Sequence, residues 1–321
     1  GVFYLLNTFL HFSFINDVAG PAGIAVIHSA FNVIATAVLL PFGDVLVKMA
    51  CATIRDTKEE KAISEEDQEF MILESRFLSN PGIAIEQSKT AAKKMAEQSQ
   101  NALKLSFGLL DTFQEENAFR VEKIEAKVDR YEDELGTYLI KLNQKELSVE
   151  DSHSLSIMLH CIGDFERISD HALSIMKSAK EMWEKNAVFS PQAVKELHVM
   201  EKAVVDIVDK AYAVFANQDI QLAEEIEPLE EVIDELSREL KRRHVNRLRA
   251  GECTIEMGFI LSDVTTSLER IADHCSNIGV CVTQVREDLY DTHSHLDSVK
   301  NAPGELFHHE LEVARVNYML P

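Results

Sequence analysis

The stretch FERISDHALSI, residues 165–175, decides the fold of this chain, because a near copy, LERIADHCSNI, follows at residues 268–278. Six of the eleven positions are identical: Glu, Arg, Ile, Asp, His and the final Ile. A second pair, VEKIEAKVDRYEDEL (residues 121–135) and IEPLEEVIDELSREL (residues 226–240), is 105 residues apart, whereas the first pair is 103 apart. Two segments that recur at nearly one spacing indicate a duplicated unit. We therefore expect two tandem three-helix bundles.

The region between Ile83 and Tyr290 has few β-branched clusters and no hairpin dipeptides, so it predicts helices and not strands. The NPG sequence at residues 80–82 supplies a cap and a proline for a first long helix. Pro228, near the start of the fifth helix, is expected to delay or kink its first turn. The predicted fold class is all-α, with six helices and breaks near residues 111–117, 143–151, 186–191, 217–219 and 249–253.

The composition excludes some partners. Lys and Arg total 32 against 54 Asp and Glu, which gives the 321-residue chain a net charge of −22. A nucleic-acid surface needs an excess of basic side chains, so nucleic acid is not an expected partner. The five cysteines have no CxxC spacing, which favours reduced, buried thiols over a zinc site.

The duplicated helices carry four Glu-x-x-x-Asp pairs. Residues four apart share one helix face, with Cβ atoms about 6 Å apart, and like charges at that spacing are mildly destabilising. Hard cations prefer oxygen ligands, so we favour metal binding over a solvated acidic face. The eight candidate ligands are Glu125, Asp129, Glu166, Asp170, Glu230, Asp234, Glu269 and Asp273.

Other polar side chains accompany these pairs. His171 and His274 follow the aspartates directly, so they point about 100° away from the Glu/Asp face. Arg167 and Arg270 lie four residues before these histidines, and Asn277 continues the Glu269/Asp273 stripe. We expect these five residues to support the ligands or contact neighbouring helices and not to bind the metal themselves. The counterpart of Asn277 is a serine, which makes the two predicted sites unequal.

A ferritin-like di-iron bundle is the competing metal site, and we reject it. That fold needs Glu-x-x-His on two facing helices. The two matches by spacing, at residues 150–153 and 305–308, lie at a helix start and in the tail.

The first 50 residues differ in charge from the rest of the chain. Only two charged residues, Asp17 and Asp44, occur before residue 48. The uncharged run Gly23–Leu40 nearly spans a hydrocarbon core of about 30 Å, so it predicts a transmembrane helix, with a buried soluble helix as the alternative. Basic residues that follow this run place its C-terminal end in the cytoplasm.

A polar stripe runs along the predicted transmembrane helix. His28, Asn32 and Thr36 recur at every fourth position, and polar groups in lipid face a helix partner or a water-filled path. Both interpretations of the stripe stay open. We divide the chain into a transmembrane part at 1–50, a connector at 51–80, a helical domain at 81–290 with repeats at about 81–185 and 190–290, and a tail at 291–321.

The tail carries His293, His295, His308 and His309. A histidine-rich stretch is able to bind a transition metal, but we favour a solvated helix or loop.

The motifs ERISDHA and ERIADHC resemble the Glu-Arg-Ile-x-Asp-His signature of the PhoU family. The resemblance implies tandem three-helix bundles whose Glu/Asp-x-x-x-Asp motifs bind multinuclear clusters of iron or another divalent or trivalent metal ion. The stretch GPAGIAVIHSAFNVIATAVLLPF, residues 20–42, resembles the final membrane segment of bacterial sodium/phosphate cotransporters, with His28, Phe31 and Asn32 in the HxxFN pattern. Residues 73–97 resemble the join between such transporters and their C-terminal PhoU-like domain.

This order of parts implies the C-terminal portion of a sodium-dependent phosphate transporter in the inner membrane, with its helical domain in the cytoplasm. Inorganic phosphate and sodium are then partners through the full transporter. The glutamine- and serine-rich transport repeats of that family do not occur in this sequence, so we expect no phosphate transport by this chain alone.

Two functions stay open at this point. The first is regulation of phosphate uptake through metal clusters. The second is a metal-independent helical scaffold, a homodimer among its forms, in which arginine and lysine side chains neutralise the carboxylates. The sequence has no Ser/His/Asp constellation and no glycine-rich phosphate loop, so we do not expect an enzyme.

Overall fold

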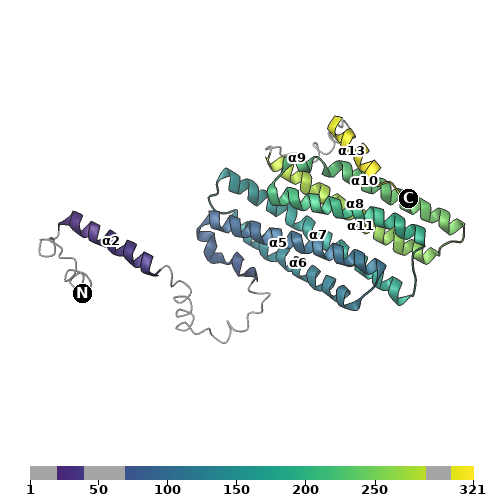
Figure 1. The fold of residues 1–321 in the computed structure, drawn as a ribbon, viewed down its shortest axis with the longest axis horizontal. Helices are drawn as coiled ribbons and strands as arrows, with labels where there is room; N and C mark the ends of the chain where they lie inside the picture. Colours follow the sequence, from purple (N-terminus) through teal and green to yellow (C-terminus); the bar gives the residue numbers. More distant parts are fainter. Residues whose placement is uncertain (1–19, 40–68, 287–304) are drawn as a thin grey trace. The chain divides into compact units, whose positions relative to one another are not determined.

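The computed structural model describes residues 20–39, 69–286 and 305–321, and these residues are helical with short connections and no strand. The chain forms two compact units, Gly1–Glu65 and Glu66–Pro321. Figure 1 shows the helical bundle of the second unit. The predicted all-α class is confirmed.

The described part of the first unit is helix α2 (Pro21–Leu39). The large apolar side chains of Ile24, Phe31 and Val33 on this helix are more than half exposed. His28, Asn32 and Thr36 also lie exposed on it. A helix is therefore present where the sequence predicted one. However, none of the described helices combines the length and the apolar character that crossing a bilayer requires, so the transmembrane prediction is not confirmed.

Residues 69–286 of the second unit, all of them described, contain six long helices, three for each repeat. The predicted breaks are confirmed, because every one of the five falls between two successive long helices. Their bounds are α5 (Pro81–Asp111), α6 (Glu115–Leu142) and α7 (Val149–Glu184), then α8 (Pro191–Asn217), α10 (Ile226–Arg249) and α11 (Ile255–Arg286).

Local sequence signals explain where these helices begin and end. The Ser148 hydroxyl accepts a hydrogen bond from the Asp151 backbone N–H at 3.1 Å, and Ser190 caps α8 in the same way at 3.2 Å. Proline occupies the first turn of α5 and of α8, where no backbone N–H is needed. Pro228 is the third residue of α10, so it too lies in a first turn and does not interrupt the helix.

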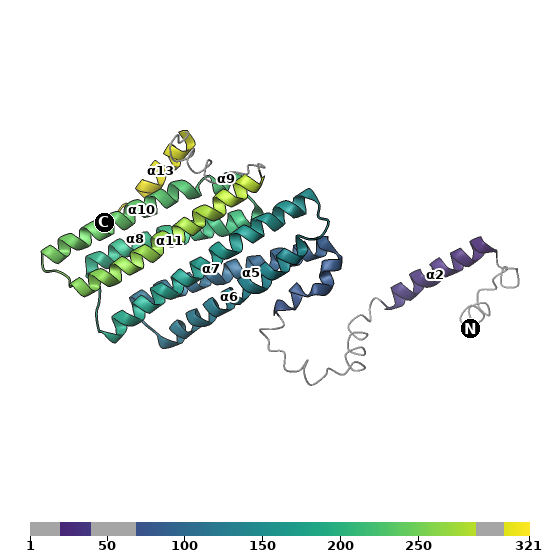
Figure 2. The ribbon, with the colours of Figure 1, turned by 180° about the vertical axis from the view of Figure 1, so that it is seen from behind.

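The two repeats share one hydrophobic core. Helix α7 packs on α5 and α6 and also on α11, which in turn packs on α8 and α10 (Figures 1 and 2). Phe165, Ile168 and Ala172 are at most 1% exposed, at the helical spacing that faces this core. Glu166 and Asp170 therefore fall on the flank of α7, and the same spacing places Glu269 and Asp273 on the flank of α11.

The register of the duplication is visible in the burial pattern of α5 and α8. Four of the buried positions of α5 illustrate this, because each has a buried counterpart 105 residues later in α8. The pairs are Ala92 with Leu197, Met95 with Met200, Ser99 with Val204, and Leu103 with Val208.

Two short segments cover the outside of the bundle. The turns η3 (Met71–Leu73) and η4 (Ser75–Ser79) pack on α5 and α6. Helix α13 (Glu305–Asn317) packs on α10 and buries Leu311, while His308 and His309 are exposed. The described part of the tail, residues 305–321, thus contains a helix with one buried side and is not fully solvated. His293 and His295 lie outside the described residues.

Candidate metal centre

Three of the predicted ligands come together in the second repeat. Glu230 and Asp234 are one turn apart on α10, and Asp273 lies on α11. One carboxylate oxygen from each residue lies within 4.8 Å of those of the other two. Glu230 is only 4% exposed, and the Oδ1 atom of Asp234 is buried with no hydrogen-bond partner among the described residues. A buried oxygen of this kind is costly unless a proton or a cation satisfies it.

The charges around Asp234 bring the fourth ligand into the same group. Burial raises the pKa of Asp234, and the neighbouring carboxylates of Glu269 and Asp273 raise it further, with Arg238 opposing them. The short distances from Asp273 to the α10 carboxylates, and the hydrogen bond from Ser237 of α10 to Glu269 of α11, agree that the two Glu-x-x-x-Asp pairs face one another. The four carboxylates predicted for this repeat therefore form one cluster.

Two members of the cluster already have protein partners. Glu269 accepts a hydrogen bond from the Ser237 hydroxyl at 2.9 Å and lies 3.3 Å from the Lys241 ammonium group. Asp273 pairs with Arg270 at 3.0 Å. These contacts orient the carboxylates and leave Asp234 as the ligand with an unsatisfied buried oxygen.

The first repeat has a similar but looser group. Burial and then the charge of Asp170 raise the pKa of Glu166 to about 7, although Arg167 acts in the opposite direction. Burial also raises the pKa of Glu125, followed by the charges of Asp170 and Asp129. The pairs on α6 and α7 thus face one another as well. Within the described residues, only the second repeat brings three ligand atoms as close as 4.8 Å.

On α7 and α11, the arginine that follows the motif glutamate binds the motif aspartate. Arg167 lies 3.0 Å from Asp170, matching the Arg270 contact in the second repeat. Both arginine side chains are 60% exposed. Exposed pairs of this kind contribute between 0 and about 1 kcal/mol, so they compensate the clusters weakly.

The histidines predicted beside the ligands meet each other across the two repeats. The rings of His171 and His274 lie 5.8 Å apart between centroids. The Nδ1 atom of His274 is 2.9 Å from Asp164 Oδ1, and the Asn277 amide donates to the same oxygen at 3.3 Å. Asn277 therefore contacts the other repeat and does not extend the carboxylate stripe toward a metal.

Sequence reasoning missed Asp164, Ser237 and Lys241. Asp164 has Ser267 as its counterpart 103 residues later, so the repeat carried no signal for it. Ser237 and Lys241 lie three and seven residues after Asp234, on the α10 face toward α11. A search of that face for polar groups would have found them. The polar residues His28, Asn32 and Thr36 belong to the other unit of the chain.

The structure is a duplicated six-helix bundle in which motif carboxylates of two neighbouring helices face one another in each half. The PhoU domain family model matches residues 92–179 and 197–282, one match for each repeat and together more than half of the chain. This chain belongs to the PhoU domain family.

Named relatives agree with this assignment. The chain is 30% identical over 115 residues to "Phosphate-specific transport system accessory protein PhoU homolog 1" of Thermotoga maritima, a match that covers 36% of this chain and 49% of the relative. The chain thus spans about half the length of that relative. It is 22% identical over 160 residues to the PhoU homolog of Deinococcus radiodurans, covering 50% of this chain and 74% of the relative.

Two solved structures share the fold. PhoU from Pseudomonas aeruginosa aligns with a TM-score of 0.54 at 21% identity, covering 66% of this chain and 98% of that one. The phosphate transport system regulatory protein PhoU from Streptococcus pneumoniae aligns with a TM-score of 0.59 at 17% identity, covering 66% and 100%.

Proposed function

We propose that this chain regulates phosphate uptake as the cytoplasmic domain of a sodium-dependent phosphate transporter in the inner membrane. Membership of the PhoU family supports a role in phosphate transport, because its relatives carry the names of accessory and regulatory proteins of phosphate transport systems. The resemblance of residues 20–42 to a transporter membrane segment supports the attachment. The role is regulatory and not catalytic.

The same proposal assigns the two carboxylate clusters to metal ions, of iron or another divalent or trivalent cation. The observation that carries it is the cluster of Glu230, Asp234 and Asp273, in which one buried oxygen has no hydrogen-bond partner among the described residues. These residues fit a cation that prefers oxygen ligands. A bound cation would neutralise the mutual repulsion of the carboxylates. It would also join α10 to α11, and the first cluster would join α6 to α7.

Metal binding is tested by Asp234→Asn and Asp273→Asn. We expect less bound metal per chain in elemental analysis of protein purified without chelators. The wild-type protein should melt at a clearly lower temperature after chelation, because a ligand that binds only the folded state adds stability. Asp133→Asn, at an exposed position of α6, is the matched control and should keep its metal.

Asp234→Asn also gives a result of opposite sign in the metal-free protein. Since burial and then the neighbouring carboxylates raise the pKa of Asp234, its ionised form destabilises the folded state at neutral pH. The variant should therefore melt slightly above wild type with chelator present and below it without chelator. Unchanged metal content and no effect of chelator would contradict the metal assignment.

The second candidate is a metal-independent scaffold, which the Arg167–Asp170 and Arg270–Asp273 pairs favour. It predicts a melting temperature that does not respond to chelator and falls in high salt, which screens exposed pairs.

Regulation is tested by phosphate uptake in cells that express the native protein. Uptake of radiolabelled phosphate should respond differently to external phosphate in the Asp234→Asn/Asp273→Asn variant. Replacement of sodium by choline tests the coupling ion. Identical uptake by the variant and wild type at every phosphate concentration would refute the regulatory role of the clusters.

A further inference from the structure

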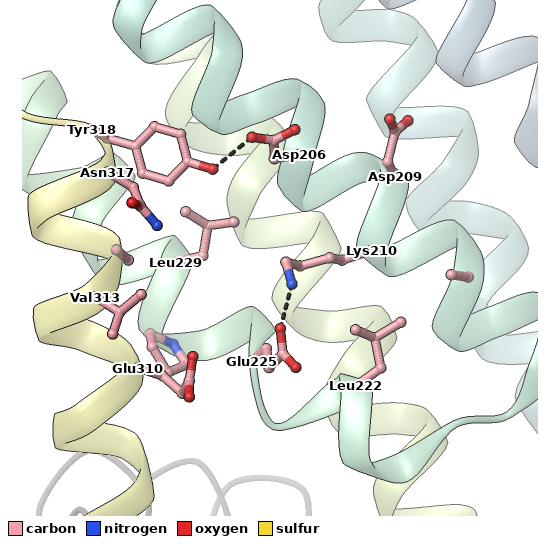
Figure 3. Close-up of a pocket in the computed structure, with 13 residues that line it drawn as sticks. Asp206, Asp209, Lys210, Leu222, Glu225, Leu229, Glu310, Val313, Asn317 and Tyr318 are labelled. Atoms are coloured by element: carbon pink, nitrogen blue, oxygen red, sulfur yellow. Dashed lines mark hydrogen bonds and ion pairs between the residues drawn. The ribbon is translucent and has the colours of Figure 1, made fainter.

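Each repeat has a surface groove at the same place, but only the groove of the second repeat is lined by residues of α13. In the second repeat, α8, α10, the short helix α9 (Ile220–Ala223) and α13 enclose a hollow of about 490 Å³ (Figure 3). Asp206, Asp209 and Glu225 make its wall acidic. The Tyr318 hydroxyl, just beyond α13, donates a hydrogen bond to Asp206 at 2.6 Å, and Lys210 forms an ion pair with Glu225. A helix of the chain itself therefore forms one wall of this groove.

The first repeat has the corresponding groove between α5 and α6, with a volume of about 570 Å³. Six of its lining residues each lie 105 residues before a residue that lines the hollow of the second repeat. These six are Asn101, Lys104, Leu105, Arg120, Lys123 and Ile124. The same offset of 105 residues relates the buried positions of α5 to those of α8. No described helix stands over this groove as α13 stands over the other.

The charge of the two grooves is opposite. Arg120 takes the place of Glu225, Lys104 that of Asp209, and Lys123 that of Pro228. The groove of the first repeat is thus basic, on a chain with a net charge of −22. A cluster of cations at one place on an acidic protein attracts acidic groups of a partner.

Two of the three cations have no carboxylate partner in the part of the chain that the structure describes. Lys104 lies 3.0 Å from Asp209, whereas Arg120 donates to the Asn117 side chain at 3.4 Å. Lys123 lies 4.9 Å from the centre of the Phe119 ring, and that ring is 56% exposed. Across the described residues, no Asp or Glu lies within ion-pair distance of Arg120 or Lys123. The groove is thus lined by the apolar side chains of Leu105 and Ile124 and by the cations of Arg120 and Lys123.

Beside this groove, side chains of α5 and α6 already bind one carboxylate, that of Glu69. Glu69 pairs with Lys127, lies 3.8 Å from Lys94, and accepts a hydrogen bond from the Tyr131 hydroxyl at 2.6 Å. The groove at Arg120 and Lys123 continues this interface along the same two helices, α5 and α6.

We propose that the α5–α6 groove binds an acidic amphipathic helix of a partner protein, in the manner in which the α8–α10 groove receives α13. Leu105 and Ile124 contact the apolar side of that helix, while Arg120 and Lys123 pair with its carboxylates. This interface is separate from the carboxylate clusters, so it stands whether or not these bind metal.

The test uses a fluorescent peptide of residues 305–317 with Arg315→Glu, titrated with the full chain. This peptide keeps the Val313 and Ala314 side that lines the other groove, and it lacks that segment's arginine. We expect saturable binding that weakens as salt rises. Arg120→Glu/Lys123→Glu should weaken binding at least about 10-fold, the equivalent of 1.4 kcal/mol. Lys141→Glu/Lys145→Glu, an equal change of charge at the end of α6 and in the turn that follows it, should leave binding unchanged.

Several results would overturn the proposal. No binding by the wild-type chain, or equal binding by the Arg120→Glu/Lys123→Glu variant, would place no helix in this groove. Displacement of the peptide by inorganic phosphate at constant ionic strength would make it a phosphate site instead. A wild-type dimer that becomes a monomer in the Arg120→Glu/Lys123→Glu variant would make a second copy of the chain the occupant.

Discussion

Glu201 shows, for a single residue, how burial controls a carboxylate in this bundle. It lies on α8 and is 8% exposed. Burial raises its pKa to about 7; His198, 3.8 Å away, opposes the shift, and the charge of Asp111 adds to it. His198 is itself bound to Asp111 at 2.9 Å, a contact that raises the pKa of His198. The three residues therefore form a group that responds to pH near neutrality.

We predict that Glu201→Gln flattens the pH dependence of stability. A carboxyl group whose pKa is raised by folding contributes stability below its unfolded value of about 4.5 and loses it as pH rises to about 7. Glutamine does not ionise, so the variant should exceed wild type by about 2 kcal/mol at pH 8 and match it near pH 4.5. Urea denaturation at both pH values measures this. Glu184→Gln, at an exposed position, is the control, and parallel curves for wild type and Glu201→Gln would contradict the prediction.

The residues that the sequence made predictable are those that recur. The carboxylates of the four motifs were found because each occurs in both repeats at one spacing. Asp164 and Lys241 were missed, because neither is repeated and each acts through a neighbouring helix. The contact between Glu69 and Tyr131, 62 residues apart, depends on tertiary packing in the same way.

Among the elements, helix ends were predicted well because their signals are local. Capping serines, first-turn prolines and left-handed residues such as Gln218, with φ of 54°, act within a few residues of the break they cause. The short helix α9 was not predicted, since four residues carry no periodic pattern. The buried side of α13 was also missed, because Leu311 is buried only by α13 packing against the bundle.

Removal of one capping hydroxyl should have a measurable cost. We predict that Ser148→Ala destabilises the chain by about 1 kcal/mol, because the backbone N–H of Asp151 loses its acceptor at the start of α7. The denaturation midpoint in urea measures this. Gln114→Ala, at the start of α6 where no side-chain cap exists, should change stability by less than half as much. Equal losses for the two variants would contradict the assignment of Ser148 as a cap.

For the whole second unit, the two repeats are held by α7 against α11 and are covered unequally on the outside. Helix α13 adds buried contacts to the second repeat alone. Arg315 binds Glu235 at 2.6 Å, and the backbone oxygen of Pro321 accepts a hydrogen bond from Arg243 at 2.8 Å. The C-terminal segment is therefore part of the folded domain.

We predict that deletion of residues 305–321 lowers the unfolding free energy by about 3 kcal/mol, since Leu311 and Tyr318 lose their burial. Amide hydrogen exchange should quicken in α8 and α10 and stay unchanged in α5 and α6. Val316→Ala, at a side chain that is 68% exposed, is the control. Faster exchange spread evenly over both repeats would show that α13 acts on the domain as a whole and not on one groove.

The cysteines make the contact between the repeats open to direct chemical observation. The pKa of Cys161 on α7 is raised by a hydrogen bond with the Cys281 thiol on α11 and by burial. Burial also raises the pKa of Cys275. Such shielded, protonated thiols react slowly with alkylating reagents, whereas the half-buried Cys253 is accessible. Any signal that parts α7 from α11 would therefore speed iodoacetamide labelling of Cys161 and Cys281 relative to Cys253. The domain carries its own reporter of whether its two halves stay together, with an internal reference on the same chain.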